Sequence, residues 1–366
     1  MAYYNPSDRY FILSKETAYG TIVPPNSPPT NGQRLYPIIP ADGITMTVDP
    51  GQNIFETNIG RGYPYLVNNV GIKTITGTMN CLIDKGVNGT SGSSVLNAKS
   101  LIEWGVGTDE GPSLSDLPSY TLYSGITGIA ASDPPNQMYT GLKVASLTLS
   151  SGGDQGEQRL TAAYDLVGKR YFYGLECVEQ NDDPDLTEFP AEADENLSNY
   201  PDGNGYYHSE GSLTLAVAGT PGGTTAPGGL LADATVSSIT MTFTNTLDMG
   251  LGTGNSMTHC TLMGRTVACD MTIEYDTDAW NKAFQGFDAD SNDVVAPARV
   301  GLTMKYGTSG NTPADQLIFN LQTSGIITAL EPIETLNTRS RANISILARL
   351  GTSGADFTKE FEFSQA

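Results

Sequence analysis

The sequence has 366 residues, of which only 16% are charged, and its formal net charge is −21. The length allows two domains of ordinary size, each with its own core. A strongly acidic chain is a poor candidate for holding DNA through its phosphates. From Tyr171 to Gly264 there are 13 acidic residues and no Lys or Arg. This segment is either an ordinary solvated surface or a surface that does not adhere to polyanions.

Residues 1–34 are predicted to form an extended polar arm, because they end in the proline-rich stretch VPPNSPPTNGQ. The first residues contain no basic region followed by an apolar run, and no apolar stretch approaches the length that spans a bilayer. We therefore expect neither a secretion signal nor a membrane anchor. From about residue 35 the apolar and polar residues alternate in short runs, which is typical of strands.

The strand-like segments occur twice. DGITMTVDPG at 42–51 shares Ile-Thr-Met-Thr with SSITMTFTNT at 237–246. KTITGTMNCLID at 73–84 and RTVACDMTIEYD at 265–276 follow, with Met at the same place in both. Three more pairs come in the same order, at 117–125 and 298–307, 141–153 and 316–330, and 157–169 and 339–351. With one helix in each copy, six elements in the same order indicate a duplicated unit.

The helix of each copy is predicted directly after its second strand. SSVLNAKSLIEWG at 93–105 and DTDAWNKAFQGF at 276–287 both have apolar residues at helical spacing and a Ser or Asp that can cap the first turn. An apolar face at this spacing favours core packing over a ligand site. The predicted helix core consists of Leu101, Trp104, Trp280 and Phe284.

These elements predict a mainly β chain of four parts. They are an N-terminal arm at 1–34, a first domain at 35–175, an acidic linker or insertion at 176–230, and a second domain at 231–366. Within the linker, GSLTLAVAGT at 211–220 has the pattern of a single strand and is a candidate entry strand of the second unit.

Two long loops are expected at matching places in the two copies, at 49–71 and 244–264. Loops of this length are unusual in a small β domain, and they are either flexible or used for contacts. Their apolar residues favour contacts with a partner. These residues are Ile54, Phe55, Tyr63, Tyr65, Leu66, Leu247, Met249, Leu251 and Met257.

The sequence offers little material for catalysis or cofactor binding. It has only two His, no nucleophile elbow and no phosphate-binding P-loop. The four Cys show no paired spacing, and we expect them to be reduced thiols of a protein made in a reducing compartment. We therefore expect no catalytic residue and no cofactor.

Two segments resemble parts of metal sites. DADSN at 288–292 is similar to the first half of a calcium loop, but Asp293 and Arg299 stand where Gly and Glu are required. His259 and two cysteines, Cys260 and Cys269, could meet near the base of a loop, but zinc lacks a fourth ligand there. We expect no metal at either place.

One segment resembles the tail tube proteins of phages with long non-contractile tails, the siphophages. It is YTGLKVASLTLSSGGDQGEQRLTAAYDLVGK at 139–169, taken together with the order of strands, long loop and helix. In that family a Gly-apolar-Lys-Val-x-Ser-Leu-Thr-Leu strand is followed by a turn and a strand that ends in apolar-Val-Gly-Lys. The second copy departs from this motif and is included through the internal repeat. The two matched parts cover roughly 35–170 and 231–366.

The resemblance implies two tandem tail-tube-type β-sandwich or barrel-forming domains, each flanked by one α-helix. It implies rings whose inner strands line a lumen, with three duplicated chains in place of six, and a long loop that reaches the neighbouring ring. The expected function is structural and not enzymatic. The expected partners are other copies of the chain, the tape measure, tail terminator and tail tip proteins, and DNA that passes without specific binding. The expected place is the virion tail, assembled in the bacterial cytoplasm, and an acidic lumen would repel DNA phosphates.

Two alternatives remain open. A tail terminator or baseplate protein shares the tube fold, although such proteins generally need only one copy of the domain. A duplicated β-sandwich adhesion or carbohydrate-binding module would present exposed aromatic platforms, whereas both Trp are assigned here to helices. The duplication favours the tube subunit.

Overall fold

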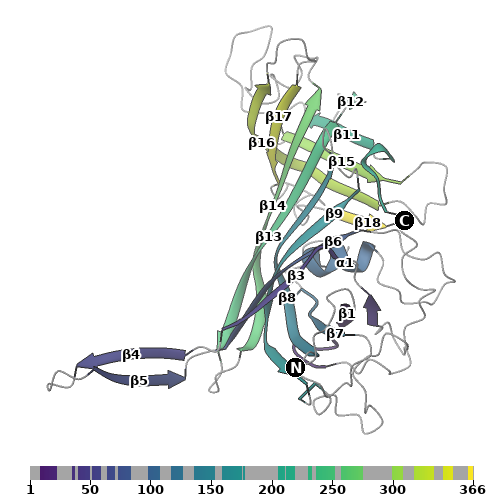
Figure 1. Cartoon of the computed structure of the whole chain (residues 1–366). Coiled ribbons are helices and arrows are strands. Elements are labelled where there is room, and N and C mark those ends of the chain that lie inside the picture. The colour runs from purple at the N-terminus through teal and green to yellow at the C-terminus, as the bar shows by residue number, and fades with distance from the viewer. Residues whose placement is uncertain are drawn as a thin grey trace.

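The structure is a computed structural model of the chain (Figure 1). It describes residues 9–22, 35–37, 40–49, 52–58, 64–70, 73–83, 98–107, 117–126, 136–152, 159–174, 176–177, 205–210, 212–218, 230–232, 236–251, 257–274, 299–307, 317–333, 341–348 and 362–365. Strands dominate these residues, and 16 of them form one connected sheet. The predicted mainly β fold is confirmed.

The first half of the chain contains one α-helix and the first group of strands. They are β1 (Arg9–Lys15), β2 (Leu35–Pro37), β3 (Pro40–Asp49), β4 (Gln52–Asn58), β5 (Pro64–Val70), β6 (Thr74–Leu82), α1 (Ala98–Val106), β7 (Tyr120–Ile126), β8 (Gln137–Gly152), β9 (Thr161–Gly168) and β10 (Arg170–Tyr173).

The second half contains the remaining strands and a short 3-10 helix. They are η4 (His208–Glu210), β11 (Ser212–Ala218), β12 (Leu230–Ala232), β13 (Val236–Leu251), β14 (Met257–Glu274), β15 (Arg299–Tyr306), β16 (Leu317–Ile333), β17 (Arg341–Leu347) and β18 (Glu362–Gln365).

Both halves pair their strands in the same order. The first half runs β3-β6-β9-β8-β7-β1-β2, and the second runs β13-β14-β17-β16-β15-β11-β12. Even the short strands β10 and β18 pair with equivalent partners, β8 and β16. The repeat predicted from the sequence is therefore present in the strand topology.

The register of the pairs repeats as well as their order. Ile44 in β3 lies opposite Met79 in β6, and Ile239 in β13 lies opposite Met271 in β14. These are the Ile and Met residues that align in the two copies of the sequence. Because a slip of one residue would turn every side chain to the other face, the shared register means that both copies bury the same positions.

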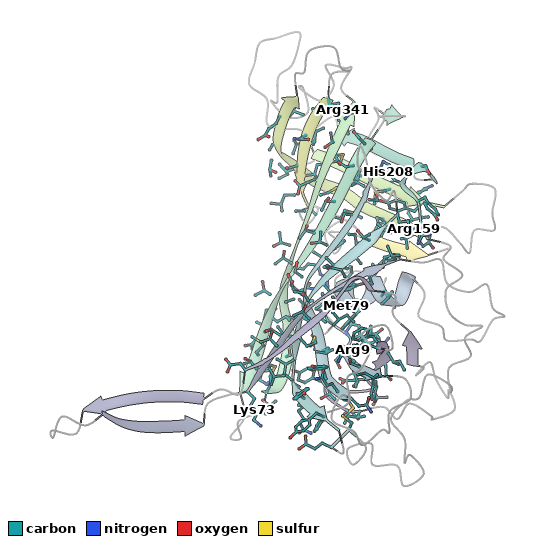
Figure 2. All side chains as sticks on the ribbon, in the orientation of Figure 1. Arg9, Lys73, Met79, Arg159, His208 and Arg341 are labelled. Carbon is teal, nitrogen blue, oxygen red and sulfur yellow. The ribbon has the colours of Figure 1, made fainter. Side chains whose placement is uncertain are left out.

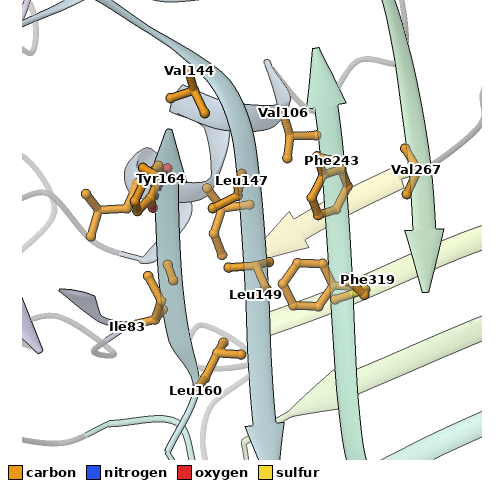
Figure 3. Close-up of a cluster of buried hydrophobic side chains, with 14 of the residues drawn as sticks. Ile83, Val106, Val144, Leu147, Leu149, Leu160, Tyr164, Phe243, Val267 and Phe319 are labelled. Carbon is orange, nitrogen blue, oxygen red and sulfur yellow. Dashed lines mark hydrogen bonds between the residues drawn. The ribbon is translucent and has the colours of Figure 1, made fainter. Parts of the chain in front are cut away.

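One face of the long sheet is buried. Figure 3 shows Leu147 of β8 next to Phe243 of β13, and both are fully buried. Helix α1 packs on this face through Trp104, whose Nε1 donates a hydrogen bond to the Leu142 carbonyl at 3.1 Å. The Trp104 ring also stacks on Tyr164, with 5.4 Å between the ring centroids. Leu101, from the same predicted helix core, is buried on this face too.

Helix α1 ends before Gly107, which has a φ of 90° and donates its N–H to the Glu103 carbonyl at 2.7 Å. This is the left-handed conformation that glycine adopts easily after the last turn of a helix. The second predicted helix, at 276–287, lies outside the described residues, and so do Trp280 and Phe284.

Three sequence expectations need correction. Residues 9–15 do not belong to an arm, because β1 pairs with β7 and buries Ile12 and Leu13 completely. The loop expected at 49–71 contains the hairpin β4–β5. The loop expected at 244–264 is mostly strand, because β13 continues to Leu251 and β14 begins at Met257.

Both segments were predicted to be loops because their polar and Gly residues obscure the alternation of apolar and polar residues that is typical of a strand. The strand expected at 211–220 is present as β11. Among the described residues, no helix has the length and apolar character needed to cross a bilayer.

Candidate assembly surfaces

The two halves of the chain are joined by strand pairing, which we call the seam. Ser238–Thr244 of β13 pairs antiparallel with Ser146–Gly152 of β8. Phe243 lies opposite Leu147, and Met241 lies opposite Leu149. All four of these side chains are at most 1% exposed, so the seam is as fully buried as a domain core.

A buried side chain extends the seam beyond the last strand pair. The Asn245 amide Nδ2 donates hydrogen bonds to the Gly105 carbonyl at 2.9 Å and to the Val144 carbonyl at 3.0 Å. Arg265 Nε donates to Asn245 Oδ1 at 3.0 Å, which fixes the orientation of the amide. Asn245 therefore ties the base of the β13–β14 hairpin to helix α1 and to β8.

The seam also defines two unused edges. The seam is formed by β13 and β8. The strand of the second half that is equivalent to β8 is β16. The first-half equivalent of β13 is β3. Within the described residues, β3 pairs only with β6, and Ala329–Ile333 of β16 pairs only with β17. Among the residues that the structure describes, each chain therefore presents one edge of each kind that forms the seam, with no strand paired to it.

Eight strands form a continuous wall, in the order β3-β6-β9-β8-β13-β14-β17-β16. We call the face of this wall opposite the core the hydroxyl face. Its described positions are rich in Thr and Ser and alternate with the buried residues of each strand. Members of this set include Thr45, Thr47, Thr76, Thr78, Ser146, Thr148, Ser150, Thr240, Thr242, Thr244, Thr266, Thr272 and Ser345.

The charges in the middle of the hydroxyl face are acidic. Asp165 of β9 and Asp270 of β14 are both exposed, and Ser345 Oγ donates to Asp270 Oδ1 at 2.5 Å. Figure 2 shows the basic residues Lys73 and Arg341 at opposite ends of the long strands. The described middle of this face therefore carries negative charge from these two aspartates.

The two aspartates occupy one equivalent pair of positions. Asp165 lies opposite Thr78 in the first half, and Asp270 lies opposite Ser345 in the second. In the shared register, Thr78 corresponds to Asp270 and Asp165 corresponds to Ser345. Each half therefore carries one carboxylate at this cross-strand pair. It lies on β9 in the first half and on β14 in the second.

The predicted contact loops form two equivalent hairpins. Ile54 of β4 lies opposite Asn68 of β5, just as Met249 of β13 lies opposite Cys260 of β14. The β13–β14 hairpin continues along the wall, whereas β4–β5 projects away from the body of the molecule (Figure 1). The two equivalent hairpins therefore point in different directions relative to the body of the molecule.

The structure places the predicted contact residues differently from one another. Phe55 lies in β4, Tyr65 and Leu66 lie in β5, and Tyr63 is outside the described residues. Leu251 ends β13, Leu247 is half-buried, and Met249 is 44% exposed and available for contact. Met257 is only 2% exposed, so the expectation of an exposed contact is wrong for this residue.

Met257 is covered by the segment after β1. The Tyr19 hydroxyl donates to Met257 Sδ at 2.9 Å. The Lys143 ammonium lies 5.2 Å from the centre of the Tyr19 ring and donates a hydrogen bond to the Cys260 carbonyl. Lys143 is only 1% exposed. The β13–β14 hairpin is therefore fixed to the first half by a buried cation.

A buried carboxylate lies in the same region. Glu16 Oε1 accepts hydrogen bonds from Thr121 Oγ1 and from the Gly141 N–H, both at 2.7 Å. Glu16 Oε2 accepts from the Gly20 N–H at 2.7 Å. Burial lowers the pKa of the nearby Lys169, as does Arg170, while Glu16 raises it. We call Glu16, Tyr19, Thr121, Lys143 and Lys169 the polar cluster.

The polar cluster and the role of Asn245 are not predicted by the sequence pattern. The available signal was Lys143, a lysine inside the apolar strand pattern GLKVASLTL, since a buried lysine requires partners. Glu16 and Tyr19 could not be connected with it because they lie more than one hundred residues earlier in the chain.

A Ser–His contact near the other end of the seam has the residue types of a nucleophile and a base. Ser151 Oγ is 3.2 Å from His208 Nδ1, and His208 Nε2 is 2.6 Å from the Val236 carbonyl. The Tyr306 hydroxyl is 2.5 Å from Ser151 Oγ. Ser151 is only 4% exposed, so a substrate cannot reach it, and the contact links β8, β15 and η4 structurally.

The cysteines do not form the metal site that was considered. Cys260 and Cys269 are both buried in β14, nine residues apart, which separates them by about 30 Å along a strand. The idea that these thiols meet near a loop base is therefore wrong. Burial raises the pKa of the Cys269 thiol and raises that of Cys177 to about 12. Among the described residues no group of three or more His, Cys, Asp and Glu could hold a metal ion, and 288–299 lies largely outside them.

No protein-family model matches the chain, and no curated protein sequence matches it.

Proposed function

We propose that the chain is a structural subunit of a bacteriophage tail tube, in which three copies close a pseudo-hexameric ring. The observation that carries the proposal is the seam with its two unused edges. If β3 of one chain pairs with β16 of the next, the chain-to-chain contact repeats the geometry of the β8–β13 contact inside each chain. Around a ring of three chains, seams within a chain then alternate with equivalent seams between chains. Every edge of the wall is paired in this arrangement.

The dimensions suit a tube. Eight wall strands from each of three chains give 3 × 8, or 24, strands. At the usual strand spacing and a tilt of about 40°, such a barrel is about 50 Å across at the backbone. Side chains on the inner face leave a channel of about 40 Å, which is wider than a DNA duplex.

The hydroxyl face is the surface that would line this channel, because the opposite face is occupied by the core and α1. Its Thr and Ser side chains are neutral, and Asp165 and Asp270 are negative, so the wall offers DNA phosphates no cationic partner in its middle. The genome would pass through without specific binding.

The hairpins support stacking of the rings. The distal part of β13–β14 and the projecting β4–β5 would reach the neighbouring ring, with Met249 as an exposed apolar contact. The partners of the tube would be other copies of the chain and the tape measure, terminator and tip proteins. The assembled protein would belong to the virion tail, after assembly in the bacterial cytoplasm, and it would have no enzymatic activity.

Negative-stain electron microscopy of the purified chain, over a series of concentrations, tests this proposal. Hollow tubes or rings of sixfold appearance are the expected result, with three chains per ring by native mass spectrometry. Rings that never stack would favour a tail terminator. A chain that remains monomeric at the highest concentration would refute the assembly function.

A further inference from the structure

The two halves differ in chemistry at one equivalent position, where β8 and β16 enter the wall. A bulge marks this position in both strands, between Val144 and Ser146 and between Ile327 and Ala329. The residue before each bulge pair is Lys143 in the first half and Ile326 in the second. Lys143 is only 1% exposed, whereas Ile326 is 37% exposed.

Two other members of the polar cluster, Thr121 and Glu16, have also been replaced. Leu122 and Leu302 hold the same place next to the bulge of their strand, so Thr121 corresponds to Gly301. By the pairing of β1 with β7 and of β11 with β15, Glu16 corresponds to Ala218. The second half therefore has Ile, Gly and Ala where the first half has Lys, Thr and Glu.

The site around Lys143 is occupied by the chain's own β13–β14 hairpin, through the Cys260 carbonyl and Met257. The hairpin equivalent to β13–β14 is the one formed by β3, β4, β5 and β6. In the shared register Cys260 corresponds to Asn68 of β5. This hairpin projects away from its own chain (Figure 1), and among the described residues its strands β4 and β5 pair only with each other.

We propose that Ile326 is the centre of an apolar docking site for the β3–β6 hairpin of a second copy of the chain, with β5 near Asn68 covering it. The inference rests on the proposed ring, and it assigns each of the two seams its own chemistry. The seam inside the chain is closed by the polar cluster. The seam between chains is closed by an apolar contact.

Physical reasons favour this division. A contact that forms within one folding chain can bury Lys143, because the groups that surround it are always present. A contact between separate molecules must first desolvate its surfaces, and the cost of removing a charge from water weakens association. Ile326 carries no such cost. A neighbour's hairpin could also displace β13–β14 only by breaking the hydrogen bond from the buried Lys143 ammonium to the Cys260 carbonyl.

The sequence of the first hairpin agrees with an apolar attachment. Asn245, which ties β13–β14 to Val144 and Gly105, corresponds in the aligned sequence to Pro50, whose side chain cannot donate a hydrogen bond. The sequence of the first hairpin therefore has no side-chain amide at this position. We expect β4–β5 to align with the wall when it docks on the next chain.

The test compares Ile326→Glu with two matched variants in the full-length chain. Thr328→Glu places the same charge on an exposed neighbouring position of the same strand, and Ile326→Leu keeps an apolar side chain. Assembly is followed by sedimentation over a concentration series, and folding of the unassembled chain is followed by urea denaturation. Ile326→Glu should raise the concentration required for assembly by about ten-fold or more. Its urea midpoint should match that of the wild type, and the other two variants should assemble normally.

The outcomes separate this inference from the proposed function. If the wild type assembles and Ile326→Glu assembles equally well, the docking site is refuted while the tube function stands. If the wild type does not assemble at any concentration, the proposed function itself fails. A loss of assembly by Thr328→Glu as large as that by Ile326→Glu would show that any added charge on β16 is harmful, and would also overturn the specific role of Ile326.

Discussion

Covalent capture of the seam between chains would test its register directly. In the seam inside the chain, Thr242 of β13 lies opposite Thr148 of β8. The equivalent residues across the chain boundary are Thr47 and Glu331, both exposed. Directly opposed residues of antiparallel strands have Cα atoms about 4.5–5.5 Å apart, within the range of about 4.4–6.8 Å that a disulfide bridges. The double variant Thr47→Cys with Glu331→Cys should therefore oxidise between chains once the protein assembles.

Non-reducing gel electrophoresis after mild oxidation would show the products. We expect covalent dimers and trimers and nothing larger, because the third bond closes the ring. The four native cysteines are buried and should not compete. Pairing Thr47→Cys with Ile333→Cys is the control, since the diagonal distance of about 7–8 Å is too long for a disulfide. Equal yields from both pairs, or a ladder that continues past the trimer, would refute the seam register.

Three further variants or conditions have defined expectations. Trp104→Ala should lower the free energy of unfolding by about 3–5 kcal/mol in urea denaturation, because the buried ring packs on the core and leaves a large cavity. Asp165→Lys combined with Asp270→Lys should make assembled particles bind a short DNA duplex in a salt-dependent way, measured by fluorescence anisotropy, whereas the wild type should not bind. Burial raises the pKa of Cys177 to about 12 and also raises that of Cys269, whereas a thiol in the unfolded chain titrates at about pH 8.5. The two protonated thiols therefore contribute their full stability below about pH 8.5, and this contribution is lost as the pH rises toward 12. The urea midpoint should therefore fall between pH 8 and pH 11, with thiol labelling slow in the native protein, and a constant midpoint with rapid labelling would contradict the burial.

Much of the strand order could be predicted because alternation and repetition are local signals. The Ile-Thr-Met-Thr pair identified β3 and β13 as equivalent, and the aligned methionines did the same for β6 and β14. The structure adds that β3 pairs with β6 and β13 with β14. The error over residues 9–15 has a clear cause. Arg9–Lys15 is a short strand next to a proline-rich segment, and its burial depends on β7, which comes more than one hundred residues later. Only tertiary contacts distinguish such a strand from an arm.

The candidate site was less accessible to sequence reasoning. The seam depends on which edges meet in space, and no local pattern in β8 or β13 encodes that pairing. Met257 has the apolar character of a contact residue, and its burial depends on Tyr19, which is far away in the sequence. The difference between Lys143 and Ile326 becomes informative only after the bulges have aligned the two strands.

The seam inside each chain has a consequence for how quickly rings can nucleate. A ring built from six separate domains must bring six bodies together, and each association step loses translational and rotational freedom, at an estimated cost of about 4–15 kcal/mol. Joining two copies in one chain, with β13 already paired to β8, halves the number of bodies and leaves three contacts to form. The concentration dependence of nucleation should fall accordingly, so that a dilute pool of subunits could still begin a ring.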